Sequence, residues 1–260
     1  MPGRLTTVDD AERLAQGVVA AERLRRAHVA GAEVLEIDGL VLTLANLPDP
    51  ALSSVVVEQE PNDAIAALHE AERAFTQRAM QFGIDLQRHR HPRVDEAVGS
   101  MGLRRIIERP GMAIDPRALE ERPAPDGFEI REVRAPGDAD ALVQVGVLAF
   151  GDTPEVGRAF YGSTALAASD DVRSLVAWRG DEPVGIASAY LHRATTGVMG
   201  VGVVPSARRR GLGAALTTCA ARSFAGTDLV WLHPSDEARS MYERLGFRRV
   251  SDWEVWVRVG

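Results

Sequence analysis

The sequence predicts an α/β protein built from two related halves. Segments with the β-branched or alternating pattern of strands alternate with segments whose apolar residues recur every three or four positions, as in helices. A proline-containing stretch over residues 115–127 separates two such series near the middle of the 260-residue chain. Short motifs of the second series recur in the first at one constant spacing, which indicates an internal duplication.

The composition excludes several classes of function. All 30 residues counted as lysine or arginine are arginine, so a Walker phosphate loop and a Schiff-base lysine are absent. The net charge of −7 argues against general nucleic-acid binding. The single cysteine, Cys219, allows no intrachain disulfide and no cysteine-rich metal site. We expect no metal. Because no apolar run approaches the length of a membrane span and Met1–Asp10 lacks a signal-peptide core, we also expect a cytoplasmic protein without a membrane partner.

The first half is expected to begin with a helix and to continue as a strand-rich unit. Leu14, Val18 and Ala21 recur at helical spacing, and Asp38-Gly39 between two apolar runs is typical of a tight hairpin turn. The expected elements are a helix over 7–29, strands over 34–37, 40–44 and 53–58, a helix over 61–82, a short strand over 84–86, a helix over 94–101 and a strand over 103–107.

Residues 118–126 are the predicted linker, with Pro123 and Pro125 as its breaks. They would separate a domain over 1–117 from a second domain over 127–260. The elements expected in the second domain are a strand over 128–133, helices over 138–150 and 155–168, strands over 173–178, 183–191 and 196–204, a helix after a glycine loop, a strand over 228–232, another helix and a final pair of strands.

The stretch from Val201 to Leu216 is the most informative of the chain. A β-branched run ends at Pro205, three arginines follow, and Gly211 and Gly213 open an Ala/Leu-rich helical pattern. The first N–H groups of a helix have no partner within it, and that end of the helix dipole is positive. Such a loop suits a diphosphate. The structural alternative is a helix start whose glycines only allow close packing.

This stretch, Arg208-x-x-Gly211-x-Gly213, resembles the coenzyme A pyrophosphate loop of the GNAT superfamily of acyl-CoA N-acyltransferases. Met241-Tyr242-Glu243-Arg244-Leu245-Gly246-Phe247 is similar to a second motif of that family, in the order and at the distance expected. The resemblance covers roughly residues 126–260. It implies a GNAT fold with a mixed sheet, acetyl-CoA as co-substrate and an amine as acceptor, with the protein a monomer or homodimer.

The resemblance also implies which residues bind the cofactor. Backbone groups of Val201 and Val203 would pair with the pantetheine arm. The pyrophosphate would lie on the loop formed by Arg208, Arg209, Arg210, Gly211, Leu212, Gly213 and Ala214. Two positions depart from the family pattern. Ser235 is the nearest polar substitute for an asparagine that many relatives carry, and residues 195–204 contain no carboxylate that could serve as a base.

The first half is predicted to be a degenerate copy of the second. Gly102–Ile106 parallels Gly246–Val250, and the two glycines stand 144 residues apart. At this spacing the loop motif falls on Ala64–His69, which has neither glycine nor arginine. Asp63 would stand at that helix start, where its charge favours the helix dipole and would repel a diphosphate. We therefore expect tandem GNAT folds of which only the second retains the cofactor site.

Tyr242 is the candidate general acid, because its position matches the tyrosine of the family motif; packing is the structural alternative. His233 is the first candidate for the base, and Asp152, Glu155 and His192 are looser ones. An α-amine acceptor, with a pKa of about 7.7–8.0, needs no strong base. The predicted function is N-acetyl transfer from acetyl-CoA to an amine of a small molecule or peptide. The alternative is a non-catalytic acyl-CoA sensor or interaction module, and nucleic-acid binding is the weakest hypothesis.

Overall fold

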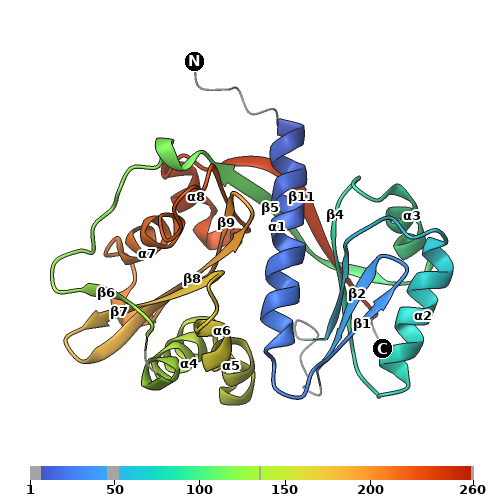
Figure 1. Ribbon diagram of the computed structural model, residues 1–260, viewed down its shortest axis with the longest axis horizontal. Helices are drawn as coiled ribbons and strands as arrows, with labels where there is room; N and C mark the ends of the chain where they lie inside the picture. Colours follow the sequence, from blue (N-terminus) through green and yellow to red (C-terminus); the bar gives the residue numbers. More distant parts are fainter. Residues whose placement is uncertain (1–6, 46–52, 135, 259–260) are drawn as a thin grey trace.

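Strands from both halves of the chain form one continuous sheet. The computed structural model describes residues 7–45, 53–134 and 136–258, and within them the sheet has eleven strands in the order β1-β2-β3-β4-β11-β5-β10-β9-β8-β7-β6 (Figure 1). Helices lie against both faces. The expected mixed α/β architecture is thereby confirmed, with parallel pairing of β3 with β4 and of β9 with β10, and antiparallel pairing elsewhere.

The first half follows the expected order of elements. Asp38 and Gly39 both have positive φ, as the tight hairpin turn between β1 and β2 requires. Asp63 caps α2, and its side chain accepts a hydrogen bond from the Ala66 N–H. The elements are α1 (Thr7–Ala27), β1 (Glu33–Ile37), β2 (Leu40–Leu44), β3 (Ser54–Val57), α2 (Ala64–Thr76), β4 (Gly83–Gln87), α3 (Pro92–Ser100) and β5 (Arg104–Ile114).

The second half begins after a short 3₁₀ turn and an irregular segment that runs to Gly127. Its elements are β6 (Glu129–Glu132), α4 (Pro136–Phe150), α5 (Pro154–Tyr161), α6 (Thr164–Ala167), β7 (Val172–Arg179), β8 (Glu182–His192), β9 (Thr195–Val203), α7 (Leu212–Ala221), β10 (Leu229–Leu232), α8 (Asp236–Arg244) and β11 (Arg248–Val257). The proposed boundaries of the two domains, 1–117 and 127–260, stay a prediction.

Three expectations were wrong in detail. The helix over 155–168 is two helices, because α5 ends at its C-cap Gly162 and the side chain of Ser163 caps the next helix, α6. The strand predicted to end at residue 107 continues to Ile114, through Pro110. A pair of strands was expected at the end of the second half, but the described chain ends with the single strand β11. Strand β5 of the first half lies beside it, between β11 and β10.

That replacement is a reciprocal exchange of strands between the halves. β5 of the first half pairs with β10 of the second, and β11 of the second half pairs with β4 of the first. β5 and β11 pair with each other antiparallel, and their register brings Arg109 opposite Trp253. These two residues stand at the same 144-residue spacing as Gly102 and Gly246, so they mark the centre of an approximate two-fold relation between the halves.

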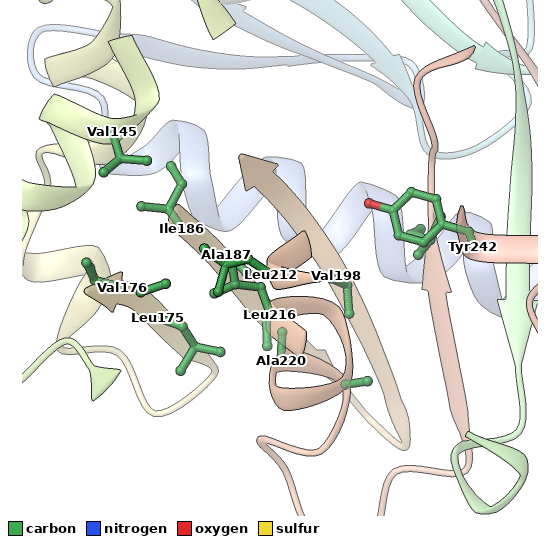
Figure 2. Packing of buried hydrophobic residues seen from close by; sticks show 14 of the residues in the cluster. Val145, Leu175, Val176, Ile186, Ala187, Val198, Leu212, Leu216, Ala220 and Tyr242 are labelled. Atoms are coloured by element: carbon green, nitrogen blue, oxygen red, sulfur yellow. The ribbon is translucent and has the colours of Figure 1, made fainter. Parts of the chain in front are cut away.

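Helices α4 and α7 cover opposite faces of the sheet in the second half. A Cβ at Gly185 would meet Leu216 of α7, whereas a Cβ at Gly202 would meet Ala149 and Phe150 of α4. Gly202 pairs with Ile186, and consecutive strand residues such as Gly185 and Ile186 point to opposite faces. Figure 2 shows the resulting apolar cluster, in which Tyr242 of α8 also takes part.

Helix α1 joins the two halves. It crosses the centre of the sheet in Figure 1 and contacts β8 and β9 of the second half as well as β1 and β3 of the first. The Trp231 indole lies between Gly17 of α1 and Gly197 of β9; a Cβ on either glycine would stand 2.4 or 2.3 Å from it. The fully buried carboxylate of Asp10 pairs with Arg248. The first half is thus part of the core of the second.

Among the helices of the described residues, none combines the length and the apolar character that a membrane-spanning segment requires.

Candidate active site

A cavity of about 910 Å³ lies between β9, the glycine loop, α7 and α8. It contains the predicted cofactor residues Val201, Val203, Arg208, Arg209, Gly211, Leu212, Gly213, Ala214 and Ser235 among its lining residues. Arg210 belongs to the same loop but does not line the cavity. Its charged side chains are Arg122, Arg208, Arg209, Arg244 and Glu237, so the cavity is predominantly positive, as a site for phosphates should be. We call this cavity the cofactor groove.

The glycine loop leaves a row of backbone N–H groups without partners. Arg209 and Gly211 both have positive φ, and Gly211 caps α7 without any side-chain hydrogen bond. Ala215 is the first residue whose N–H binds back into the loop, at the Gly211 carbonyl. Within the described chain, the N–H groups of residues 209–214 have no acceptor in the protein. This row, at the positive end of a helix dipole, has the donors and the electrostatic field that suit an anion.

The Arg208 side chain uses two of its donors to hold the loop in place. Its Nε donates to the Val203 carbonyl at 3.0 Å and its Nη2 to the Ala149 carbonyl at 2.9 Å. These bonds tie the loop to the end of β9 and to the end of α4. The linker covers the other rim, because Pro125 Cγ would lie 3.7 Å from a Cβ on Gly211. Sequence reasoning missed this role of Arg122, Pro123 and Pro125.

Strand β9 has a free edge beside the groove. It pairs with β10 only over Thr195–Gly197, so the backbone groups beyond Gly197 on that edge are not used by β10. A register shift in the ladder with β8 falls between Met199 and Gly202, and Gly200 has positive φ. The shift is a β-bulge, which turns the strand locally. Val201 and Val203 therefore lie where a bound chain could pair with the strand.

Tyr242 lies on α8 with only 6% of its surface exposed. Burial raises the pKa of its phenol to about 12, an effect that the neighbouring Thr217 hydroxyl opposes but does not cancel. The phenol is therefore neutral and carries its proton at physiological pH. Its ring packs edge-on against the ring of Phe247, with 5.9 Å between the ring centres, and this packing holds the orientation of the phenol.

A second cavity, of about 550 Å³, lies between the two halves of the chain. Its walls come from α1, β3, β4 and β5 of the first half and from α4, α5, β9, β10, α8 and β11 of the second. We call it the junction cavity. It shares five lining residues with the cofactor groove: Phe150, Val201, Ser235, Ala238 and Tyr242. The two cavities thus meet at Tyr242.

His233 faces the junction cavity and does not line the cofactor groove. Its ring lies 4.8 Å from that of Trp253, and its Nε2 is shielded from solvent without a hydrogen-bond partner. Burial, reinforced by the positive charge of Arg109, holds the pKa of His233 well below its usual range. The imidazole is neutral and weakly basic. Asp152, Glu155 and His192 line neither cavity in the described structure.

Sequence reasoning missed a cluster of charged side chains in the junction cavity. Glu22, Arg25 and Arg26 come from α1, and Asp85 and Arg109 come from β4 and β5. Asp85 Oδ2 lies 2.5 Å from Arg109 Nη2. No sequence pattern signals Asp85 as a site residue, because a polar residue between the buried Ile84 and Leu86 is the ordinary alternation of a half-buried strand.

Burial has different consequences for the two carboxylates of this cluster. For Glu22, burial opposes ionisation, but Arg25 and Arg26 outweigh it and hold the pKa far below its usual range. For Asp85, burial dominates and raises the pKa although Arg109 pairs with it. Glu22 is therefore a fixed negative charge, and Asp85 is a stronger proton acceptor than a carboxylate at the surface.

The first half has no counterpart of the cofactor groove at its own helix start. Asp63 occupies the cap of α2 where Gly211 caps α7, and its carboxylate already binds the Ala66 N–H. The described residues contain no group of three or more His, Cys, Asp and Glu side chains that could hold a metal ion.

Comparisons with known proteins agree with this architecture. Residues 170–249 match the family model described as an acetyltransferase (GNAT) domain. No curated protein sequence matches the chain. A GCN5-related N-acetyltransferase from Kribbella flavida has a similar structure, with a TM-score of 0.72 and 23% identity over 94% of this chain and 96% of that one. A tandem GNAT protein from the clavulanic acid biosynthesis pathway gives a TM-score of 0.64 and 14% identity, over 98% and 96% of the two chains.

A third structure, a GCN5-related N-acetyltransferase from Sphaerobacter thermophilus, gives a TM-score of 0.60 and 19% identity, over 96% and 92% of the two chains. These likenesses extend over both halves and establish the fold, and the family match falls on β7 to β11, which include the glycine loop and Tyr242. Residues 170–249 therefore form a GNAT acetyltransferase domain, and the chain as a whole shares the fold of these GNAT structures.

Proposed function

We propose that the protein is an N-acetyltransferase that moves an acetyl group from acetyl-CoA directly to an amine of a small molecule or peptide. The observation that carries this proposal is the position of Tyr242. A buried, neutral phenol lies in the wall shared by a positive groove and a second cavity, so a proton donor stands where a cofactor and an acceptor would meet.

The residues of the groove fit coenzyme A. The free N–H groups of residues 209–214 would hold the pyrophosphate, and Arg209 and Arg244 add positive charge. The free edge of β9 at Val201 and Val203 would pair with the pantetheine arm. Ser235, whose hydroxyl makes no capping bond in α8, is available for the same arm. Bound acetyl-CoA supplies an acyl thioester.

The chemistry required of the protein is modest. A neutral amine attacks the thioester carbonyl, a C–N bond forms and the C–S bond breaks. Tyr242 would donate its proton to the departing thiolate and recover one from the nitrogen of the new amide, so the protons balance. The raised pKa of Tyr242 keeps the phenol protonated for this step.

The reaction also needs a group that accepts a proton from the acceptor amine, and a weak base is sufficient for this role. His233 is neutral, but its lowered pKa makes it a weak acceptor for a proton from an ammonium group; its free Nε2 suits a hydrogen bond to the acceptor amine. Asp85, in the same cavity, has a pKa that burial raises and is a second candidate for accepting this proton. We propose that the domain over 127–260 carries the cofactor and that the domain over 1–117 walls the acceptor cavity.

The rival function is a sensor that binds acyl-CoA without turnover. A direct test measures two quantities on the full chain: the rise in Tm with acetyl-CoA, and the release of free thiol with a panel of primary amines. Binding that occurs only in the folded state raises Tm. Thiol release that depends on an amine, with an N-acetylated product, supports the enzyme; a Tm rise without amine-dependent release supports the sensor.

Gly211→Asp should abolish the Tm rise, because it places a negative charge where the pyrophosphate would lie. Gly226→Asp is the matched control, since Gly226 also has positive φ but its Cβ would lie in open space, away from the groove. Equal loss in both variants would mean that backbone strain, not the anion site, is responsible.

A further inference from the structure

We propose that the junction cavity recognises a free amino acid with an apolar side chain, binding the carboxylate as well as the amine that is acetylated. This inference rests on the proposed function and names the class of acceptor for the same site.

The first support is a set of unpartnered polar atoms. Arg25 Nε, Asp85 Oδ1, Arg109 Nε and His233 Nε2 are all shielded from solvent without a hydrogen-bond partner, and all four residues line the junction cavity. Buried polar groups in native proteins are normally paired, so these four atoms are the ones that a ligand in the junction cavity would satisfy. The Trp231 indole N–H is also unpartnered, but it lies against Gly17 of α1.

These atoms call for opposite charges in one ligand. Arg25 and Arg109 offer N–H donors, which suit a carboxylate, whereas Asp85 offers an acceptor, which suits an ammonium group. An amine without a carboxylate would leave the arginine donors unpaired. A carboxylic acid without an amine would leave Asp85 Oδ1 unpaired. A zwitterion satisfies both.

The other polar atoms of Glu22, Arg25 and Arg26 that the structure pairs bind within the protein. Glu22 binds Arg25 and Arg26 at 2.7 Å each, and Arg26 also donates to Ser54. The Arg25 guanidinium lies 4.8 Å from the Phe160 ring centre. The five side chains carry three positive charges and two negative ones, so the cavity favours a ligand whose carboxylate is fully ionised.

The remaining walls are apolar. Val18, Ile106, Ile107, Phe160 and Met199 line the cavity beside the charged cluster. Ile106 and Ile107 are 46% and 42% exposed, which is unusual for neighbouring isoleucines in one strand. They would contact the side chain of the amino acid. The amine, held by Asp85, would then face the wall formed by Tyr242, where the cofactor groove opens.

The test compares matched acceptors on the full chain with saturating acetyl-CoA. L-leucine, L-methionine and L-phenylalanine are each paired with the amine that lacks the carboxylate: 3-methylbutylamine, 3-(methylthio)propylamine and 2-phenylethylamine. L-leucinamide adds an acceptor whose carboxylate is neutralised. Because an unpaired buried charge is costly, kcat/KM for at least one amino acid should exceed that for its matched amine by about 10²-fold.

Two variants assign the effect to the cluster. Arg109→Gln should lower kcat/KM for the preferred amino acid by about 10²-fold and bring the ratio to its matched amine close to one. Asp85→Asn should lower kcat/KM for the amino acid and for its matched amine. Arg104→Gln and Glu108→Gln are controls on the same strand, outside the cavity, and should leave the ratio unchanged. A purely structural role of Arg109 would lower all rates without changing the ratio.

The outcomes separate the two proposals. If amines without a carboxylate react as well as the amino acids, the inference is overturned and the acetyltransferase stands. If no acceptor of either kind releases thiol, the proposed function fails, and calorimetric titration of the full chain with the three amino acids decides the inference. Saturable binding that Arg109→Gln removes would support it, and its absence would overturn it.

Discussion

The carboxylate of Asp85 and the guanidinium of Arg109 lie 2.5 Å apart, although strand β11 separates the strands that carry them. Asp85 pairs with Val255 on one side of β11, and Arg109 pairs with Trp253 on the other. Both charged residues belong to the first half, whereas β11 is the last strand of the second. The acceptor site that we propose therefore exists only because the halves exchange strands.

Gly17→Ala tests the packing of α1 across the junction. A Cβ at Gly17 would stand 2.4 Å from Trp231 Nε1, so α1 must move or the indole must rotate. We expect a loss of about 1–3 kcal/mol in the free energy of unfolding, measured by denaturant titration. Gly99→Ala, at a helical site with open space, is the control and should be neutral or slightly stabilising. An unchanged stability of Gly17→Ala would contradict the packing described.

Glu22→Gln tests the buried ion cluster through its pH dependence. The folded-state pKa of Glu22 lies far below the ordinary value of 4.5, so the ionised carboxylate contributes stability above that value, and this contribution is lost as the pH falls below it. The variant should lose about 3–5 kcal/mol at pH 7, because Arg25 and Arg26 lose their partner.

The variant should also show a weaker fall in stability between about pH 5 and pH 3 than the wild type. Glu96→Gln, at an exposed site on α3, serves as the control. A variant with the same acid sensitivity as the wild type would show that Glu22 is not ionised in the folded protein.

Tyr242→Phe tests acid catalysis. It should lower kcat by roughly 10²–10⁴-fold while leaving the Tm rise with acetyl-CoA nearly unchanged. Since burial raises the pKa of Tyr242 to about 12, the wild-type rate should show no descending limb from this phenol below about pH 11. Tyr161→Phe is the control, because Tyr161 is a partly buried aromatic residue that lines neither cavity. An unchanged kcat in Tyr242→Phe would reduce Tyr242 to a packing residue.

Separate expression of residues 120–260 tests the dependence of one half on the other. The fragment lacks β5, which lies between β10 and β11, so both strands would expose unpaired edges. It also lacks α1, which covers Trp231. We expect an insoluble or unfolded fragment that co-expression of residues 1–119 rescues. A soluble fragment with full activity would remove the structural role of the first half.

The sequence was sufficient for the local features of the fold, and it identified most residues that line the groove beside α7; their binding of a cofactor stays a prediction. The Asp38-Gly39 turn, the Asp63 cap and the glycine loop are local patterns whose conformations follow from residue type. The constant spacing between the halves survives in the structure as the approximate two-fold relation of β5 and β11. These features need no knowledge of distant contacts.

The exchange of strands and the charged cluster could not be predicted in the same way. Pairing between β5 and β10 joins residues more than one hundred positions apart, and no short-range pattern specifies it. The end of β5 was missed because Pro110 and Gly111 are typical of turns; the proline is tolerated because β10 pairs only with residues 112–114. Asp85 became visible as a site residue only when β11 brought Arg109 beside it.

A crystal structure of the full chain with coenzyme A would show where the cofactor and its sulfur lie. We expect the pyrophosphate to bind the N–H groups of residues 209–214 and the sulfur to lie roughly 3–3.5 Å from the Tyr242 hydroxyl, at the opening of the junction cavity. Coenzyme A bound elsewhere, or with its sulfur directed away from Tyr242 and the junction cavity, would contradict this expectation.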